Sequence, residues 1–456
     1  MNSGIQTTWH ALNEACLRPL MLLVVATLAL TAANVPNEKP VVEPWTVTVS
    51  ANAGRAGIYQ APTRYGAYNY YVCVPSTYSA DNPAGVHLFF HGQSGQAGAP
   101  DFNRWKKYFL EPFNLIGINM QYMDGDNGKD TEGKIAAAQQ AMAQVCADYK
   151  VIIPRGLVSS FSGGGHTQGL MASMYSQERG PRWPFTMSSI YSSNYRKDAT
   201  LGVAMAWYIG VGTEEWDLAR LGVTAVNRAS EVYRGSAQGN PDVFLNITRK
   251  GHDVTDADTA VATTLFVLSD LAYAPGVYVP DYSSKELKDL RPMVEQANAL
   301  QFGTANAALT KLLARPTLAE PVKTAGMRLQ TRLNTRLDAV AAMIKRLATE
   351  DPVRTVYYDP LLLAQLKGSA NEKDARAALI AQGKDKATAK TLAAHGEFAK
   401  LVPVLFGENA GNPSPVPDKL SQLKLLAPLL GDRSESGLVA AGFLRLAPNQ
   451  EQAKAP

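Results

Sequence analysis

Residues 159–166 read SSFSGGGH and have the composition of a turn that presents a nucleophilic serine. Such a turn joins a strand to a helix so sharply that small residues are needed two positions before and two positions after the serine. Ser160 and Gly164 hold these positions around Ser162. A short apolar run precedes the turn, and a helix-like run follows it at residues 169–177. The pattern predicts a nucleophile at Ser162, with an ordinary Ser/Gly-rich turn as the alternative.

A serine hydroxyl needs a neighbouring base before it can attack a carbonyl carbon. Of the six histidines, only His252 follows Ser162, ends a strand-like run and lies in the part of the chain where strands and helices alternate. His166 comes directly after the serine turn, where we expect a local role at the end of a helix. His252 is therefore the predicted base.

An acid should accept a hydrogen bond from the imidazole and fix its tautomer. Residues 209–217 leave an apolar run and present Glu214, Glu215 and Asp217 between the serine and the histidine. Glu215 is the first choice, for the reason given below, and Asp217 is the alternative.

Backbone amides beside the serine should stabilise an oxyanion. Residues 89–98, FFHGQSGQAG, place Gly92 and Gln93 at the end of an apolar strand-like run. An amide N–H from this turn and that of Gly163 would form an oxyanion hole. The alternative is a glycine turn that only ends the strand.

The elements that must position these residues alternate between strand and helix from about residue 68 to residue 274. Continuous apolar strands separated by helices indicate an α/β fold with a mostly parallel sheet and helices on both faces. A helix is predicted at 131–149. Strands are predicted at 68–74, 85–92, 114–122, 156–165, 185–193, 203–212 and 243–252.

After about residue 275 the pattern becomes that of helices, and all six tryptophans lie before residue 217. Pro292 should interrupt the first helix. We expect a catalytic domain at 68–275, an all-α domain of unknown role at 276–456, and independent folding of residues 35–276. Helices are predicted at 284–300, 304–313, 329–347, 371–382 and 387–401.

The N-terminal segment predicts export. Arg18 precedes an apolar stretch at 19–33 that ends in small residues, as a signal peptide does. A signal peptide at 1–33 would leave an extension at 34–67 before the catalytic domain, in a periplasmic or secreted protein. The alternative is an uncleaved N-terminal anchor, and no later segment looks membrane-spanning.

The bulk composition excludes some partners. A formal net charge of +4, without a dense basic block, gives no reason to expect nucleic acid. Residues 124–130, DGDNGKD, depart from a calcium loop and are interpreted as a turn, so no metal or cofactor is expected. Cys73 and Cys146 could pair, but we favour two unpaired thiols.

The serine turn, the acidic run, His252 and the turn at Gly92 together resemble the α/β-hydrolase superfamily. The likeness is to exported esterases of the polyhydroxybutyrate-depolymerase and feruloyl-esterase type and to their prolyl-oligopeptidase-like relatives. In such families the acid usually stands three residues after the glycine that ends its strand, and this position is Glu215, counted from Gly212. The order serine, acid, histidine also matches. The resemblance is carried by residues 70–78, 91–92, 160–164, 212–215 and 251–252.

The resemblance implies a serine hydrolase that cleaves carboxylic esters, small or polymeric, through an acyl-enzyme. A prolyl-oligopeptidase-like peptidase would share the same three residues, but no β-propeller precedes this catalytic region. A third possibility is an inactive hydrolase fold that binds a partner at the cell surface.

Overall fold

The computed structural model describes most of the chain from residue 51 onward. The predicted signal peptide at 1–33, the turn at 124–130 and the candidate residues Gln93 and Asp217 lie outside the described residues. The described residues are 51–64, 68–92, 102–122, 131–175, 183–193, 206–215, 243–405, 416–432 and 434–446.

One eight-stranded sheet forms the centre of the first half, in the order β1-β2-β4-β3-β5-β6-β7-β8. β2 pairs antiparallel with β1 and β4, and every pairing from β4 through β8 is parallel. The predicted mostly parallel sheet is therefore confirmed. The strands are β1 (Gly57–Pro62), β2 (Asn69–Val74), β3 (Ala84–Phe90), β4 (Leu115–Gln121), β5 (Val151–Phe161), β6 (Met187–Tyr191), β7 (Ala206–Gly212) and β8 (Val243–Thr248).

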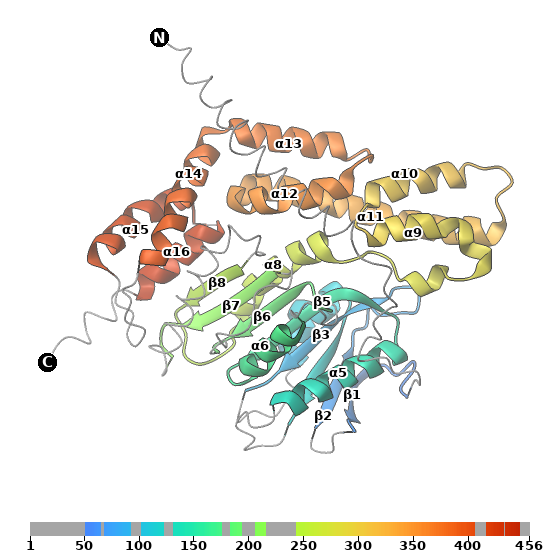
Figure 1. Ribbon diagram of the computed structural model, residues 1–456, viewed down its shortest axis with the longest axis horizontal. Helices are drawn as coiled ribbons and strands as arrows, with labels where there is room; N and C mark the ends of the chain where they lie inside the picture. The colour runs from blue at the N-terminus through green and yellow to red at the C-terminus, as the bar shows by residue number, and fades with distance from the viewer. Residues whose placement is uncertain are drawn as a thin grey trace, which may run out of the picture.

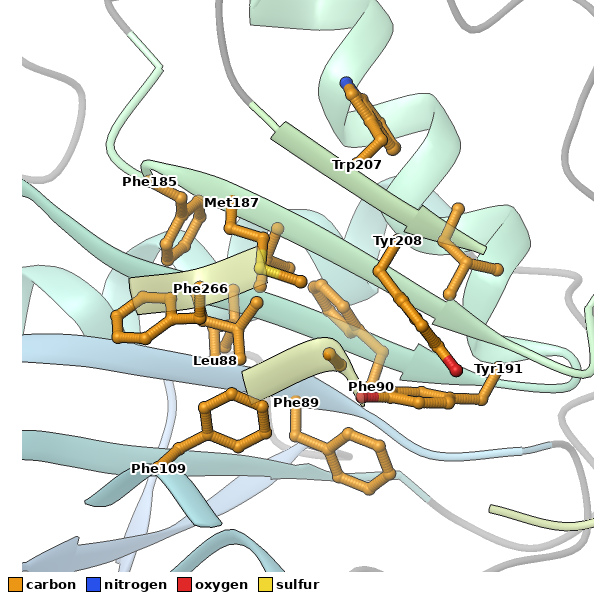
Figure 2. Close-up of a cluster of buried hydrophobic side chains, with 14 of the residues drawn as sticks. Leu88, Phe89, Phe90, Phe109, Phe185, Met187, Tyr191, Trp207, Tyr208 and Phe266 are labelled. Carbon is orange, nitrogen blue, oxygen red and sulfur yellow. The ribbon is translucent and has the colours of Figure 1, made fainter. Parts of the chain in front are cut away.

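Helices cover both faces of this sheet, as the apolar strands require (Figure 1). On one face lie α5 (Thr131–Asp148) and α6 (Gly164–Tyr175). On the other lie α3 (Phe102–Trp105), η3 (Lys106–Leu110), α4 (Glu111–Phe113) and α8 (Asp256–Tyr273). Figure 2 shows buried side chains of the sheet core, and on the second face the Phe109 ring meets the Phe266 ring edge to face at 5.8 Å.

The chain after residue 275 is helical, as predicted. Pro292 lies in the first turn of α9, directly after a 3-10 helix, so the predicted interruption is confirmed. No described helix is both long and apolar enough to cross a membrane. The helices are α9 (Arg291–Asn298), α10 (Phe302–Leu313), α11 (Glu320–Glu350), α12 (Pro352–Leu366), α13 (Glu372–Lys384), α14 (Lys386–Leu401), α15 (Pro417–Leu430) and α16 (Glu435–Leu446), with 3-10 helices η5 (Val279–Tyr282), η6 (Lys285–Leu290) and η7 (Val402–Val404).

Apolar clusters cross the boundary expected near residue 275. The sheet core includes Phe443 of α16, and the second cluster combines Leu271 of α8 with residues of α9–α13. α16 packs on β8, where Arg445 Nη1 donates to the Ile247 carbonyl at 2.8 Å. Gly442 lies so close that a Cβ there would stand 2.8 Å from the Ile247 side chain. Independent folding of residues 35–276 stays a prediction, against which this packing weighs.

Candidate active site

Ser162 lies in the tight turn between β5 and α6. Its φ of 49° falls in the left-handed region, which is uncommon for a residue with a side chain. Its amide donates to the Tyr191 carbonyl at 3.0 Å, and the Ser193 hydroxyl donates to its carbonyl oxygen. Backbone strain that the surroundings hold in this way is concentrated at functional sites.

The small residues expected around Ser162 are required by close contacts. A Cβ on Gly164 would overlap the carbonyl oxygens of Phe90 and His91 at the end of β3. Ser160 is fully buried in β5. The turn therefore has the crowded geometry that its sequence pattern predicts.

His252 lies in the loop between β8 and α8, beside Ser162. Its Nε2 is 2.9 Å from Ser162 Oγ, and its Nδ1 is 3.0 Å from Glu215 Oε2. A carboxylate only accepts hydrogen bonds, so Nδ1 carries the proton towards Glu215 and leaves Nε2 of the neutral ring as an acceptor for the Ser162 hydroxyl. The imidazole also packs against the Phe161 ring, with centroids 5.0 Å apart.

Glu215 is held at the end of β7 by two further donors. Its Oε1 accepts from the Gly212 amide at 2.6 Å and from the Ser192 hydroxyl at 2.8 Å, and its side chain is fully buried. Glu214, by contrast, points to the surface, where its Oε1 accepts from Arg249 Nε at 2.6 Å. The longer glutamate side chain fits here because one of its oxygens folds back onto the amide of its own turn.

The backbone of the predicted oxyanion turn passes beside the nucleophile. A Cβ built on Gly92 would lie 3.2 Å from Ser162 Cβ, so the Gly92 main chain borders the place where a carbonyl would be attacked. The preceding peptide is fixed, because Tyr122 donates its hydroxyl to the His91 carbonyl at 3.3 Å and stacks on the His91 ring with centroids 4.0 Å apart. Gly163 directly follows Ser162 in the turn.

Ser192 and Ser193 are site residues that the sequence analysis missed. They follow β6, which lies between β5 and β7, and their hydroxyls bind Glu215 and the Ser162 carbonyl respectively. The available signal was a pair of hydroxyl residues at the carboxyl end of a parallel strand, the edge at which α/β sheets bind ligands.

Three other described histidines, His87, His166 and His395, make contacts that stabilise the fold. His87 is fully buried in β3, with Nε2 2.8 Å from Ser159 Oγ, and burial lowers its pKa to about 3. His166 donates its backbone amide to the Gly163 carbonyl in the first turn of α6. His395 Nδ1 lies 2.6 Å from Ser436 Oγ, between α14 and α16.

Metal ligands and a disulfide do not occur among the described residues. No group of three or more His, Cys, Asp or Glu side chains there is arranged to hold a metal ion. Cys73 and Cys146 are not joined in a disulfide; Cys73 is buried in the core and Cys146 is partly exposed.

The strand order, the turn around Ser162 and the succession serine, glutamate, histidine are those of the α/β-hydrolase fold. No family model matches the chain, and no curated protein matches it in sequence.

Several solved structures are similar to roughly half of this chain. Esterase B from Lactobacillus rhamnosis has 12% identity and a TM-score of 0.35, over 57% of this chain and 94% of its own. The poly(3-hydroxybutyrate) depolymerase LpqC from Bordetella parapertussis has 15% identity and a TM-score of 0.36, over 47% and 90%. Est1E from Butyrivibrio proteoclasticus has 13% and 0.35, over 48% and 100%. At these values the likenesses do not bear on activity, and the fold assignment depends on the topology described above.

Proposed function

We propose that the protein is a serine hydrolase that cleaves carboxylic esters through an acyl-enzyme. One observation carries the proposal: the His252 imidazole bridges Ser162 Oγ at 2.9 Å and the buried Glu215 carboxylate at 3.0 Å. A base hydrogen-bonded to both a nucleophile and an orienting acid is the arrangement that activates serine.

In the first half-reaction, His252 Nε2 takes the proton of Ser162 as Oγ bonds to the ester carbonyl carbon. The negative charge on the carbonyl oxygen is stabilised by the Gly163 amide and by an amide of Gly92 or Gln93. The tetrahedral intermediate then breaks its bond to the alkoxy oxygen, which takes the proton from His252 and leaves as the alcohol.

In the second half-reaction, water attacks the acyl-enzyme while His252 again accepts the proton. Collapse of the intermediate returns that proton to Ser162 Oγ and releases the carboxylic acid. Glu215 stays ionised throughout and stabilises the imidazolium that forms in each half-reaction.

A fluorophosphonate probe and a panel of p-nitrophenyl and hydroxycinnamoyl esters test this proposal. Ser162→Ala should abolish both labelling and turnover, and His252→Ala should lower kcat by on the order of 10⁴-fold or more, because such residues act as a unit. Ser421→Ala, at an exposed serine of α15, is the matched control and should leave both unchanged. Normal turnover by Ser162→Ala on every ester that the parent cleaves would refute the proposal.

The proposal includes export of the mature chain, based on the sequence of residues 1–33. Protein recovered from the periplasm or medium of an expressing bacterium should begin at Asn34. A chain that still carries residues 19–33 and stays with the membrane fraction would instead favour the N-terminal anchor.

A further inference from the structure

We propose that Lys250 is a positioning residue that holds His252 against Ser162, an inference that rests on the proposed hydrolase function. Lys250 precedes His252 by two residues in the loop after β8, and its ammonium group binds inside the protein. The assignment follows from the contacts of this buried cation and from the open space around Gly251 in the same loop.

The ion pair between Lys250 and Asp258 is fully enclosed. Lys250 Nζ lies 2.8 Å from Asp258 Oδ2, and the two side chains are 4% and 0% exposed. Burying two charges has a desolvation cost that their attraction rarely exceeds, so an enclosed pair is weak evidence for a role in stability alone. A role in positioning the His252 loop would explain why two charges are buried here.

The Asp258 carboxylate accepts hydrogen bonds from several elements, so its position is fixed. Its Oδ1 accepts from Tyr208 at 3.1 Å and from Asn246 Nδ2 at 3.3 Å. Its Oδ2 accepts from the Thr255 hydroxyl at 2.8 Å, in the capping box that begins α8. Strands β7 and β8 and helix α8 thereby hold the carboxylate that receives the Lys250 ammonium.

Lys250, bound to Asp258, makes hydrogen bonds in the histidine loop both before and after His252. Its Nζ donates to the Asp253 carbonyl at 2.7 Å, directly after His252. Its own carbonyl accepts from the Glu214 amide at 2.9 Å, in the turn that leads to Glu215. One residue therefore connects the loop of the base, the turn of the acid and the first turn of α8.

Apolar contacts hold this loop through the Phe161 ring, which packs against the imidazole, and through the buried Val254. They leave Gly251 unsupported, since a Cβ added there would meet nothing within 4 Å, and the His252 side chain is 20% exposed. The position of the imidazole therefore depends on polar contacts as well. Since a misplacement of about 1 Å in a catalytic group can cost on the order of 100-fold in rate, the lysine contacts should matter for turnover.

The first experiment replaces the cation with an apolar chain of similar length, Lys250→Met. We expect the rate of fluorophosphonate labelling and kcat to fall by about 10- to 100-fold, with KM changed by less than about twofold. Hydrogen exchange over residues 249–255 should become faster, because the variant loses the ammonium donor to the Asp253 carbonyl and keeps the Ser192 hydroxyl, which donates to it at 3.2 Å.

Arg336→Met is the matched control, because Arg336 is a second largely buried cation, 12% exposed, bound to the same helix at its opposite end. Arg336 Nη2 donates to the Asp270 carbonyl at 2.6 Å and to the Ala274 carbonyl at 3.0 Å. This variant should lower the melting temperature while labelling rate, kcat and exchange over residues 249–255 stay as in the parent.

A double variant keeps the test decisive if Lys250→Met fails to fold. Lys250→Met/Asp258→Asn removes both charges, so it should recover stability while labelling stays slow and the loop still exchanges fast. Parental labelling and exchange in this folded double variant would overturn the inference, as would an equal slowing in Arg336→Met. A parent that no probe labels would reject the proposed function alone, and loop exchange in the double variant would then decide whether Lys250 positions the loop.

Discussion

The sheet region and the helical region both bury polar side chains, but they place them differently. In the sheet region some buried polar groups lie within strands, as His87 does in β3, but the side chains of the candidate site gather where parallel strands end: Ser162 after β5, Ser192 after β6 and Glu215 after β7. In the helical region they lie between elements, as Arg354 does when it donates to Glu435 across α12 and α16 at 3.1 Å. Parallel strands bring groups from distant sequence positions to one edge, whereas the helices use polar contacts to fix their packing.

The comparison separates residues that should control turnover from residues that should control stability alone. The two regions nevertheless share apolar surface, because α16 contributes Val439, Ala440 and Phe443 to the cluster of the sheet. Substitutions in one region at a time, with turnover and stability measured for each, test this separation.

Glu215→Gln should have the largest effect, because it removes the charge that stabilises the imidazolium and allows the wrong tautomer. We expect kcat to fall by up to ~10⁴-fold with little change in KM and in melting temperature. Steady-state kinetics on one good ester measures this.

Asp217→Asn is the comparison variant, since Asp217 was the alternative acid. It should keep kcat within a few-fold of the parent. A large loss in Asp217→Asn together with normal turnover in Glu215→Gln would transfer the role of the acid to Asp217.

The sequence predicted the central strands well, because a strand buried on both faces is a continuous apolar run. It missed β1, an edge strand of mixed burial that ends in Pro62. It also missed α12 and α15, which contain Pro360 and Pro428, residues that argue against a helix interior. In α16, Gly437 and Gly442 weaken the helix signal, and close packing outweighs their low propensity.

For the site, the sequence supplied the residues whose types and local spacing are restrictive, such as Ser162 and His252. The strand-end position of Ser192 was an available signal, but the partners of Ser192 and Lys250 depend on which strands are neighbours. β6 lies between β5 and β7, and only that order brings Ser192 to Glu215. Strand order is a property of the whole sheet and has no local signature.

Phe443→Ala tests whether the two regions unfold together. Phe443 is fully buried in α16 within the sheet cluster, so we expect a loss of about 3–5 kcal/mol in the free energy of unfolding. Trp105, Trp183 and Trp207 are buried in the sheet region, so fluorescence reports this region while far-UV circular dichroism is dominated by the helices. Both signals should shift together.

Leu337→Ala in α11 is the counterpart in the second cluster, where the side chain is 2% exposed. Two separate transitions, with fluorescence unmoved by either variant, would show that the sheet folds independently and would support the expected domain boundary near residue 275.

His87→Gln tests a buried polar group of the sheet that lies outside the proposed mechanism. Burial lowers the pKa of His87 to about 3 from its ordinary 6.5, so between these values the unfolded chain binds a proton that the folded chain does not. The contribution of His87 to stability is therefore full above pH 6.5 and falls as the pH decreases, by about 2 kcal/mol between pH 8 and pH 5. Urea unfolding at both pH values should show this loss diminished in His87→Gln.

Asp359 in α12 is the counterpart of His87 in the helical region, and its contribution to stability changes with pH in the opposite direction. Burial raises its pKa to about 7, so the folded chain retains a proton that the unfolded chain releases, and this contribution is lost as the pH rises towards 7. Asp359→Asn should therefore raise stability at pH 8 relative to pH 5. An unchanged pH dependence in both variants would contradict this account of the two buried groups.

Ser192→Ala should have the smallest effect on turnover among the substitutions at the candidate site, and it tests the comparison of the two regions most directly. Ser192 is one of two donors to Glu215 Oε1, and the Gly212 amide remains bonded at 2.6 Å when the hydroxyl is removed. Because the carboxylate is loosened rather than lost, we expect kcat to fall about tenfold, corresponding to about 1.4 kcal/mol in the activation barrier. Ser436→Ala is the matched variant, since Ser436 is also a buried serine that bonds a site of ionisation, His395, at 2.6 Å. That variant should lower stability without changing kcat, because its histidine lies between α14 and α16. Equal kinetic effects of the two substitutions would show that strand-end placement confers no special role on Ser192.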